Sequence, residues 1–307
     1  MSGQAPSSRH VSPYLLLALA ALFWSGNWVL GRAVHTDIPP VSLNFWRWVT
    51  ASGVLLPLTV ASLVAYRDVI ARRWKILVLL SATGVSAFHS AVYYALNFTT
   101  AVNALLILAT APVLIVIVTW ILFREMITGL QSVGIAVSLA GVVVLVARGS
   151  LEVLTTLKFN YGDLWMFVAI PLWAVYSALL KWRPVALPPL DLVASLALVG
   201  VLLLLPFYLL EYAVVGPFEI TLGNVASILY MGLFASVFAY VFWNRGVAAV
   251  GPNKAGLFIH LMPVFGTTLA VIFLSEAVHL YHSAGVALIF LGIYLTTRQG
   301  RSRPHLL

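Results

Sequence analysis

The chain lacks cysteine and carries very little charge. The absence of cysteine among its 307 residues excludes disulfides and thiol chemistry. Charged residues make up 8% of the chain and hydrophobic residues 62%, whereas a soluble domain carries about 25% charged residues. The net charge of +8 comes from basic residues scattered singly through short loops, which gives no basic face for nucleic acid. The composition predicts an integral membrane protein with little soluble mass.

Motifs for nucleotides, metals and covalent catalysis are also missing. The chain has no G-x-x-x-x-G-K-[ST], no H-E-x-x-H and no nucleophile elbow. His279 and His282 have a spacing that suits a weak metal site, but a solvated loop explains them better. We therefore expect no enzyme, no catalytic residue, no cofactor, no metal and no nucleotide partner.

Acidic residues are absent from the middle of every apolar segment. Asp163, Asp191, Glu211, Glu125 and Glu276 fall at segment ends, and the other acidic residues lie in loops. Proton-coupled carriers commonly relay protons through buried carboxylates. This absence predicts uncoupled, facilitative transport, unless a histidine with its unperturbed pKa near 6.5 carries protons.

The apolar segments predict an all-α protein of ten membrane-spanning helices, because a span needs about 20 mostly apolar residues. The first segment, though near the N-terminus, is too long for a signal peptide and has no cleavage site. The predicted spans are 13–31, 41–64, 74–96, 101–123, 130–147, 161–180, 190–212, 225–243, 255–274 and 281–297.

The basic residues predict the orientation of these spans. With ten spans, 13 of the 17 lysines and arginines fall on one side and three on the other. The positive-inside rule then places both termini in the cytoplasm of a multi-pass protein of the cell (inner) membrane. Arg47 lies within a span between Trp46 and Trp48, and we interpret it as a residue that snorkels to the outer surface.

The chain also contains an internal duplication. A shift of 149 residues aligns Trp24 with Trp173, and a shift of 151 aligns Pro112 with Pro263 and Glu125 with Glu276. Five spans per unit put the second unit into the membrane upside down, as in carriers built from inverted repeats. The predicted organisation is a cytoplasmic tail (1–12), a first repeat (13–149), an extracytoplasmic linker (150–160), a second repeat (161–300) and a cytoplasmic tail (301–307).

Two five-helix units that each end in P-x12-E and G-x6-G resemble the EamA-type modules of the drug/metabolite transporter superfamily. "NFWRW" (44–48) is similar to that family's pattern too, and the aromatic content looks most like amino-acid exporters of the YddG type. The resemblance implies a bundle of ten helices around a central cavity, lined mainly by the first, third, fourth, sixth, eighth and ninth spans. The fifth and tenth spans would be peripheral. Glu125 and Glu276 would be signature positions of the family. We expect them to hold the following helix in place and not to bind substrate.

Polar and aromatic side chains at mid-depth predict the lining of this cavity, because they are costly in hydrocarbon. In the first span, Trp24, Asn27, Trp28 and Gly31 share one helical face. We favour Trp24 over Trp28 as the residue that meets substrate. The predicted substrate-binding residues are Trp24, Asn27, His89, Tyr93, Trp173, Tyr176, Tyr240, Asn244 and His260. Pro112 and Pro263, in equivalent spans, are predicted hinges, with a purely structural kink as the alternative.

An uncharged cavity of this kind suits a net-neutral solute with an apolar body. We predict export of neutral amino acids, aromatic ones included, and of related metabolites by alternating access. Two alternatives remain: a broad efflux carrier for hydrophobic drugs and, from another class, an intramembrane lipid-acting enzyme or a receptor. The expected partners are the small-molecule substrate and the lipid bilayer, and a monomer is the working expectation.

Overall fold

The structure, a computed structural model, describes residues 11–274 and 279–298. These residues form helices and connecting loops and contain no strand. The α-helices of the first half are α1 (Pro13–Ala33), α2 (Pro40–Ala65), α3 (Arg67–Arg72), α4 (Trp74–Leu80), α5 (Phe88–Ala95), α6 (Ala101–Leu108), α7 (Ala111–Phe123) and α8 (Gly129–Val146). Those that follow are α9 (Leu151–Thr155), α10 (Tyr161–Leu179), α11 (Pro189–Val215), α12 (Leu222–Tyr230), α13 (Ala239–Val250), α14 (Pro252–Gly256), α15 (Leu261–Leu274) and α16 (Leu280–Thr297).

Local sequence signals mark where the long helices begin. Pro40 and Pro189 occupy the first turns of α2 and α11, where the missing N–H of proline costs nothing. Thr128 and Asn160 form capping boxes that start α8 and α10, each satisfying backbone N–H groups that a helix start leaves without partners. The predicted helical segments therefore begin close to where the sequence places them.

Nine helices of the described residues are long and apolar enough to cross a membrane. The predicted span 255–274 is not among them, and the structure there contains the end of α14, the 3₁₀ turn η4 (Leu257–His260) and α15. The other predicted spans each correspond to one of the nine. An all-helical bundle is thus observed, and the count of ten spans stays a prediction.

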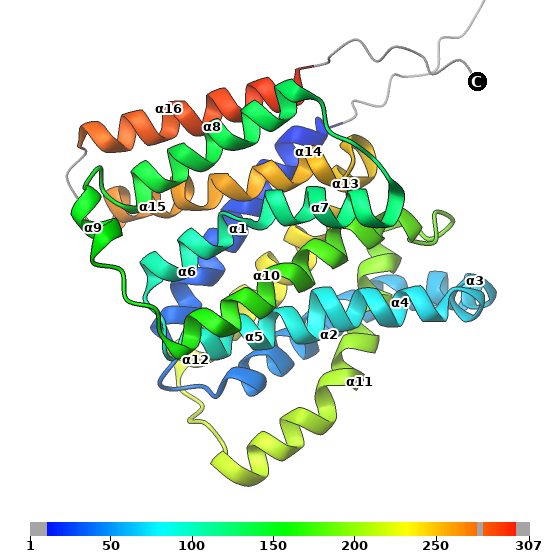
Figure 1. The fold of residues 1–307 in the computed structure, drawn as a ribbon. Helices are drawn as coiled ribbons and strands as arrows, with labels where there is room; N and C mark the ends of the chain where they lie inside the picture. The colour runs from blue at the N-terminus through cyan, green and yellow to red at the C-terminus, as the bar shows by residue number, and fades with distance from the viewer. Residues whose placement is uncertain (1–10, 275–278, 299–307) are drawn as a thin grey trace, which may run out of the picture.

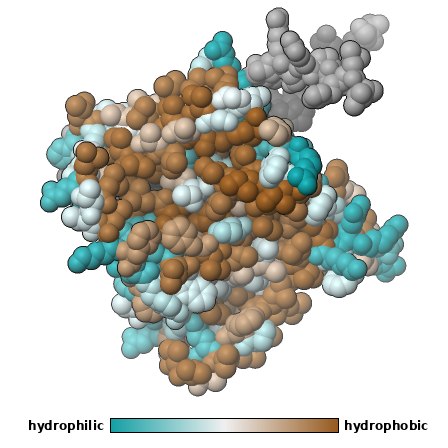
Figure 2. All heavy atoms as spheres, in the orientation of Figure 1, coloured by the Kyte–Doolittle hydropathy of each residue, from teal (hydrophilic) through white to brown (hydrophobic). Residues whose placement is uncertain are grey.

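The helices run between two faces of the molecule (Figure 1). We call the face where α1 begins and α16 ends the terminal face, on the right of Figure 1, and the face that carries α9 the distal face. In Figure 2, apolar surface fills most of the region between the terminal face and the distal face, and hydrophilic residues gather near these two faces. This distribution is the one expected of a protein whose middle is surrounded by lipid.

Reciprocal contacts between α2 and α11 relate the two halves of the chain. Glu211 accepts hydrogen bonds from Ser42 N (2.6 Å) and Ser42 Oγ (2.7 Å) at the start of α2. At the other end of the helix pair, Ser62 Oγ donates to Asp191 Oδ2 over 2.8 Å. Ser42 is equivalent to Asp191 and Ser62 to Glu211 by the 149-residue repeat. A contact and its own reciprocal occur only across a two-fold relation, so α2 and α11 pack antiparallel about such an axis.

Helices α8 and α16 lie side by side at one edge of the bundle and repeat this relation (Figure 1). Gly141 packs against Gly285, and Gly134 packs against Gly292, although the repeat aligns Gly134 with Gly285. The glycines allow the two backbones to approach closely, as small residues do in membrane helix pairs. The fifth and tenth predicted spans thus form an outlying antiparallel pair.

A single added methyl group tests this packing. A Cβ at Gly141 would lie 2.8 Å from both the Gly285 carbonyl oxygen and the Ile289 amide nitrogen, which are backbone atoms. We expect Gly141→Ala to lower stability by about 1–3 kcal/mol through overpacking. The check is the thermal unfolding midpoint of the purified protein in detergent.

The matched control is Gly53→Ala, because a Cβ on this α2 glycine meets nothing within 4 Å. Alanine favours helix more than glycine does, so this variant should melt at or above the wild-type temperature. Equal effects of the two substitutions would contradict the close helix pairing.

Candidate functional site

A small cavity lies where the two halves meet. Its volume is about 20 Å³, room for about one water molecule. The lining residues come from α1, α5, α6, α10, η4 and α15: Trp24, Asn27, Trp28, Phe88, His89, Leu108, Trp173, Ile259 and Met262. No amino acid fits in this volume, so the centre of the described conformation is too narrow to hold one.

The structure brings four of the predicted substrate-binding residues to the cavity wall: Trp24, Asn27, His89 and Trp173. Trp28 also lines the cavity, so the geometry does not favour Trp24 over Trp28 as the residue that meets substrate. Four apolar lining residues were missed by sequence reasoning, namely Phe88, Leu108, Ile259 and Met262. No sequence signal separates them from the many apolar residues that pack between helices.

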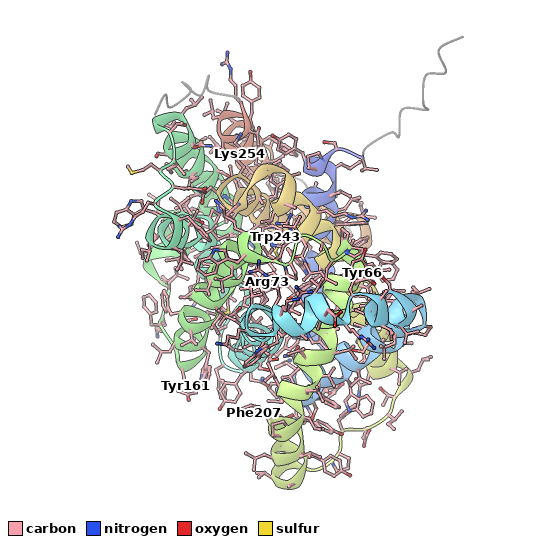
Figure 3. All side chains as sticks on the ribbon, turned by 90° about the vertical axis from the view of Figure 1, so that its right-hand side faces the viewer. Tyr66, Arg73, Tyr161, Phe207, Trp243 and Lys254 are labelled. Atoms are coloured by element: carbon pink, nitrogen blue, oxygen red, sulfur yellow. The ribbon has the colours of Figure 1, made fainter. Side chains whose placement is uncertain are left out.

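A cluster of indole rings forms the centre of the site. Trp24 meets its repeat equivalent Trp173 edge to face, with ring centroids 5.0 Å apart. Trp243, labelled near the middle of Figure 3, lies 5.3 Å from Trp24 and 5.4 Å from Trp173 and is buried. A residue that touches its own repeat equivalent lies next to the two-fold axis. The axis therefore passes between the Trp24 and Trp173 rings, which meet in the edge-to-face geometry that aromatic pairs favour.

Two π-helical segments supply backbone acceptors to this centre. They are η1 (Ser81–Ala87) and η3 (Met231–Phe238), whose starts lie 150 residues apart, within one residue of equivalent positions of the two repeats. The Ala235 carbonyl accepts from Trp24 Nε1 (3.0 Å) and from Arg47 Nη2 (2.9 Å). Its equivalent, the Gly84 carbonyl, accepts from the hydroxyl of Tyr240. Single π-helical turns in α-helices frequently occur at functional sites.

Two amide–phenol hydrogen bonds stand in reciprocal positions around the centre. Tyr93 OH donates to Asn27 Oδ1 over 2.8 Å, and Tyr176 OH donates to Asn244 Oδ1 over 2.7 Å. The repeat aligns Asn27 with Tyr176 and Tyr93 with Asn244. Both repeats therefore have the same hydrogen bond, but the amide of one repeat stands where the other has the phenol. All four residues are buried. The first pair joins α1 to α5 and the second joins α10 to α13.

Arg47 corrects the sequence interpretation. It does not snorkel to a surface: its side chain is fully buried, with 0% exposure. Its guanidinium donates to Ser236 Oγ at 2.5 Å, Tyr93 OH at 2.8 Å and Asn27 Oδ1 at 3.3 Å, as well as to the Ala235 carbonyl. The residue therefore lies directly behind the cavity wall, because Asn27 is a lining residue. The flanking residues Trp46 and Trp48 suggested the membrane–water interface. They do not show which side of the helix Arg47 lies on, and this led to the wrong interpretation.

The two predicted histidines have different surroundings. His89 lines the cavity, with Nδ1 at 3.4 Å from the Tyr240 hydroxyl. His260 is not among the lining residues: Nε2 donates to the Ala109 carbonyl (2.9 Å) and Nδ1 contacts Ser138 Oγ (2.7 Å). Because both ring nitrogens of His260 are occupied, it connects α8 to the break between α6 and α7. Histidine in an apolar segment does not itself reveal which of these situations applies.

The predicted hinge prolines follow breaks in their helices. Pro112 lies in the first turn of α7, just after the interruption between Leu108 and Ala111. Pro263 lies near the start of α15, directly after the 3₁₀ turn η4. In the described structure each proline therefore lies in the first turn of its helix and not in the middle of it. Glu125 pairs with Lys181 beyond the end of α10, and Glu276 lies outside the described residues.

Larger cavities flank the narrow centre. One of about 330 Å³ includes Arg148 and Tyr281 toward the distal face and shares Trp28 and Met262 with the central cavity. Another of about 290 Å³ includes Arg183 and Arg245 toward the terminal face and reaches Asn244. The described residues hold no group of three or more metal-ligating side chains. The arrangement is a narrow aromatic centre between two wider spaces.

Comparisons with known proteins identify relatives along nearly the whole chain. The model of the EamA-like transporter family matches residues 11–147 and again residues 160–298. An uncharacterized transporter of Archaeoglobus fulgidus is 30% identical over 92% of this chain and 96% of its own length. The uncharacterized transporter YyaM of Bacillus subtilis is 26% identical over 93% of each chain.

One similar protein carries a more specific description. A probable terminal-alkyne amino-acid exporter of Streptantibioticus cattleyicolor is 27% identical over 94% of each chain. A solved crystal structure superposes with a TM-score of 0.73 at 23% identity, over 95% of this chain and 99% of that one. The last likeness concerns the fold alone.

The amide–phenol bonds can be tested one at a time. Tyr176→Phe removes the donor to Asn244 and leaves a buried amide whose Nδ2 already has no hydrogen-bond partner among the described residues. We expect a loss of about 1–3 kcal/mol, and partial recovery in Tyr176→Phe/Asn244→Leu, where both polar partners are gone. Unfolding midpoints in detergent provide the measurement.

Tyr161→Phe is the matched control, since Tyr161 is 54% exposed. It should melt as the wild type does. If Tyr176→Phe also melts at the wild-type temperature, the buried bond does not contribute to stability as described.

Proposed function

Because the chain belongs to the EamA-like transporter family, we propose that it exports small neutral solutes, chiefly amino acids and related metabolites. With nine apolar helices in its described part, this transporter is a multi-pass integral membrane protein. The proposal includes ten spans as two inverted repeats, both termini in the cytoplasm and residence in the cell (inner) membrane. The basic residues on the predicted cytoplasmic side support this orientation.

The observation that carries the proposal is the narrow aromatic centre between two wider spaces. Exchange of the two halves' conformations would open the centre first to one side and then to the other, as in other carriers with inverted repeats. The reciprocal bonds Tyr93–Asn27 and Tyr176–Asn244 are both formed here. We assign them to closing the pathway toward the two opposite faces, each bond breaking when its side opens.

The side chains at the centre support a solute with an apolar or aromatic body. Indole faces of Trp24 and Trp173 suit such a body. Two buried donors, Trp243 Nε1 and Asn244 Nδ2, have no hydrogen-bond partner within residues 11–274 and 279–298, and a solute oxygen would satisfy them. The amino-acid assignment has additional support in the probable terminal-alkyne amino-acid exporter of Streptantibioticus cattleyicolor that this chain resembles.

The driving force is proposed to be the solute gradient. The acidic side chains Asp163, Asp191 and Glu211 are engaged at helix ends, where they accept hydrogen bonds from Asn103, Ser62 and Ser42. His89 is the titratable residue that lines the cavity. Proton coupling, if present, would therefore pass through this imidazole.

Uptake into proteoliposomes tests the function directly. We expect counterflow of phenylalanine and threonine that runs down the solute gradient and shows no uphill accumulation under an imposed pH gradient. The panel should include the common amino acids and a methyl viologen-like dication as competitor. Protein-free liposomes provide the control.

Two results would contradict this account. Failure of every amino acid, with strong competition by the dication, would favour a drug efflux carrier. Uphill accumulation driven by the pH gradient and abolished in His89→Ala would overturn the uncoupled mechanism.

A further inference from the structure

Arg47 is a buried cation without a carboxylate partner in the described part of the chain. No described Asp or Glu oxygen lies within 4.0 Å of its guanidinium; ion pairs within that distance involve Arg67 and Lys181 only. Its hydrogen-bond acceptors are all neutral: one carbonyl, one amide oxygen and two hydroxyls. Removing a charge from water without an opposite charge is costly, and such residues in membrane segments mark substrate pathways.

The internal duplication shows that the fold does not require this charge. The repeat equivalent of Arg47 on α11 is Leu196, which is equally buried at 0% exposure. Ser236, which accepts from Arg47 Nε, has Val85 as its equivalent. The same helix crossing is therefore built once with a polar pair and once with apolar residues. A purely architectural role leaves the arginine unexplained.

The position of Arg47 gives it access to the central cavity through one side chain. Asn27 lines the cavity and is held by Arg47 Nη1 (3.3 Å) and by Tyr93 OH (2.8 Å). Because Asn27 is the lining residue that Arg47 Nη1 contacts, turning the Asn27 amide aside would leave Nη1 next to the cavity. Opening of the Asn27–Tyr93 bond, which we proposed as one closure of the pathway, thus also exposes the charge.

We infer that Arg47 binds the carboxylate of the transported solute. The carboxylate replaces Asn27 Oδ1 and Tyr93 OH as acceptor of the two Nη1 hydrogens. Charge-assisted bonds of this kind are stronger than the neutral ones that they displace. The solute's apolar body then lies against the indoles of Trp24 and Trp173. The pathway is selective for monocarboxylates, zwitterionic amino acids included, and excludes amines that lack a carboxylate.

This inference deepens the proposed function and rests on it for the identity of the pathway, but its test measures binding and not transport. The probes are 3-phenylpropionate and 2-phenylethylamine, which share an aromatic ring and two methylenes and differ in carrying a carboxylate or an ammonium. Isothermal titration calorimetry on the full-length protein in detergent gives the affinity of each probe. Wild type should bind 3-phenylpropionate about tenfold more tightly or better.

Three variants separate recognition from structure. Arg47→Met should lose about tenfold in affinity for 3-phenylpropionate with no loss for 2-phenylethylamine. Arg47→Lys should fall between, because an ammonium keeps the charge and lacks the planar fork. Arg32→Met removes an exposed arginine that donates to the Leu96 carbonyl and should leave both affinities unchanged.

The inference is overturned if wild type binds the two probes equally, or binds no 3-phenylpropionate at millimolar concentration. It is also overturned if Arg47→Met weakens both probes by the same factor, which is the signature of a structural role. Should Arg47→Met fail to fold, the wild-type preference and the Arg47→Lys variant decide. Amino-acid counterflow in proteoliposomes remains a separate result, so failure of export and failure of carboxylate binding are distinguishable.

Discussion

The structure depends on one constraint: a polar group surrounded by hydrocarbon must find its partner within the protein. The centre of this bundle contains an arginine, several phenols, amides and indoles, and most of them are connected to one another or to carbonyls of the two π-helical segments. The π turns at Gly84 and Ala235 provide those carbonyls at equivalent places. The π-helical turns therefore supply hydrogen-bond acceptors that the buried polar side chains of the centre need.

The duplication explains why equivalent hydrogen bonds occur twice, with the residue types of the two partners exchanged between the helices. A bond across a two-fold relation needs one donor and one acceptor, and it does not matter which helix supplies which. Asn27–Tyr93 becomes Tyr176–Asn244, and Ser42–Glu211 becomes Asp191–Ser62. Comparison of the repeats residue by residue would find little identity at these positions. What both halves retain is the contact, which gives the pathway an equivalent closure on each side.

Much of the fold could be predicted from the sequence because hydropathy and helix caps are local signals. The predicted spans 74–96 and 161–180, for example, correspond to the helical segments Trp74–Ala95 and Tyr161–Trp182. The interruption of 255–274 at Leu257–His260 could not be predicted, since the sequence "LFIH" is apolar and has no breaker.

The wall of the central cavity was predictable where polarity marked it, as at Trp24, Asn27 and Trp173, whereas substrate binding by these residues stays a prediction. Arg47 was misinterpreted because its burial is decided by Ser236, Tyr93 and Ala235, which come from distant parts of the chain. His260 does not line the central cavity in the described structure for a related reason, since Ser138 and Ala109 hold its ring elsewhere. Periodicity places a residue on a helical face, and the partner of that face is set by tertiary packing.

The central claim is that solute passes between two equivalent halves through the Trp24–Trp173 pair. Because the chain has no cysteine, a single introduced one can be labelled alone. Ser25 and its repeat equivalent Ala174 are both buried beside this pair. A membrane-impermeant maleimide, applied to vesicles of either orientation, should label Ser25→Cys from one side and Ala174→Cys from the other. Labelling of both from the same side, or of neither, would contradict the account.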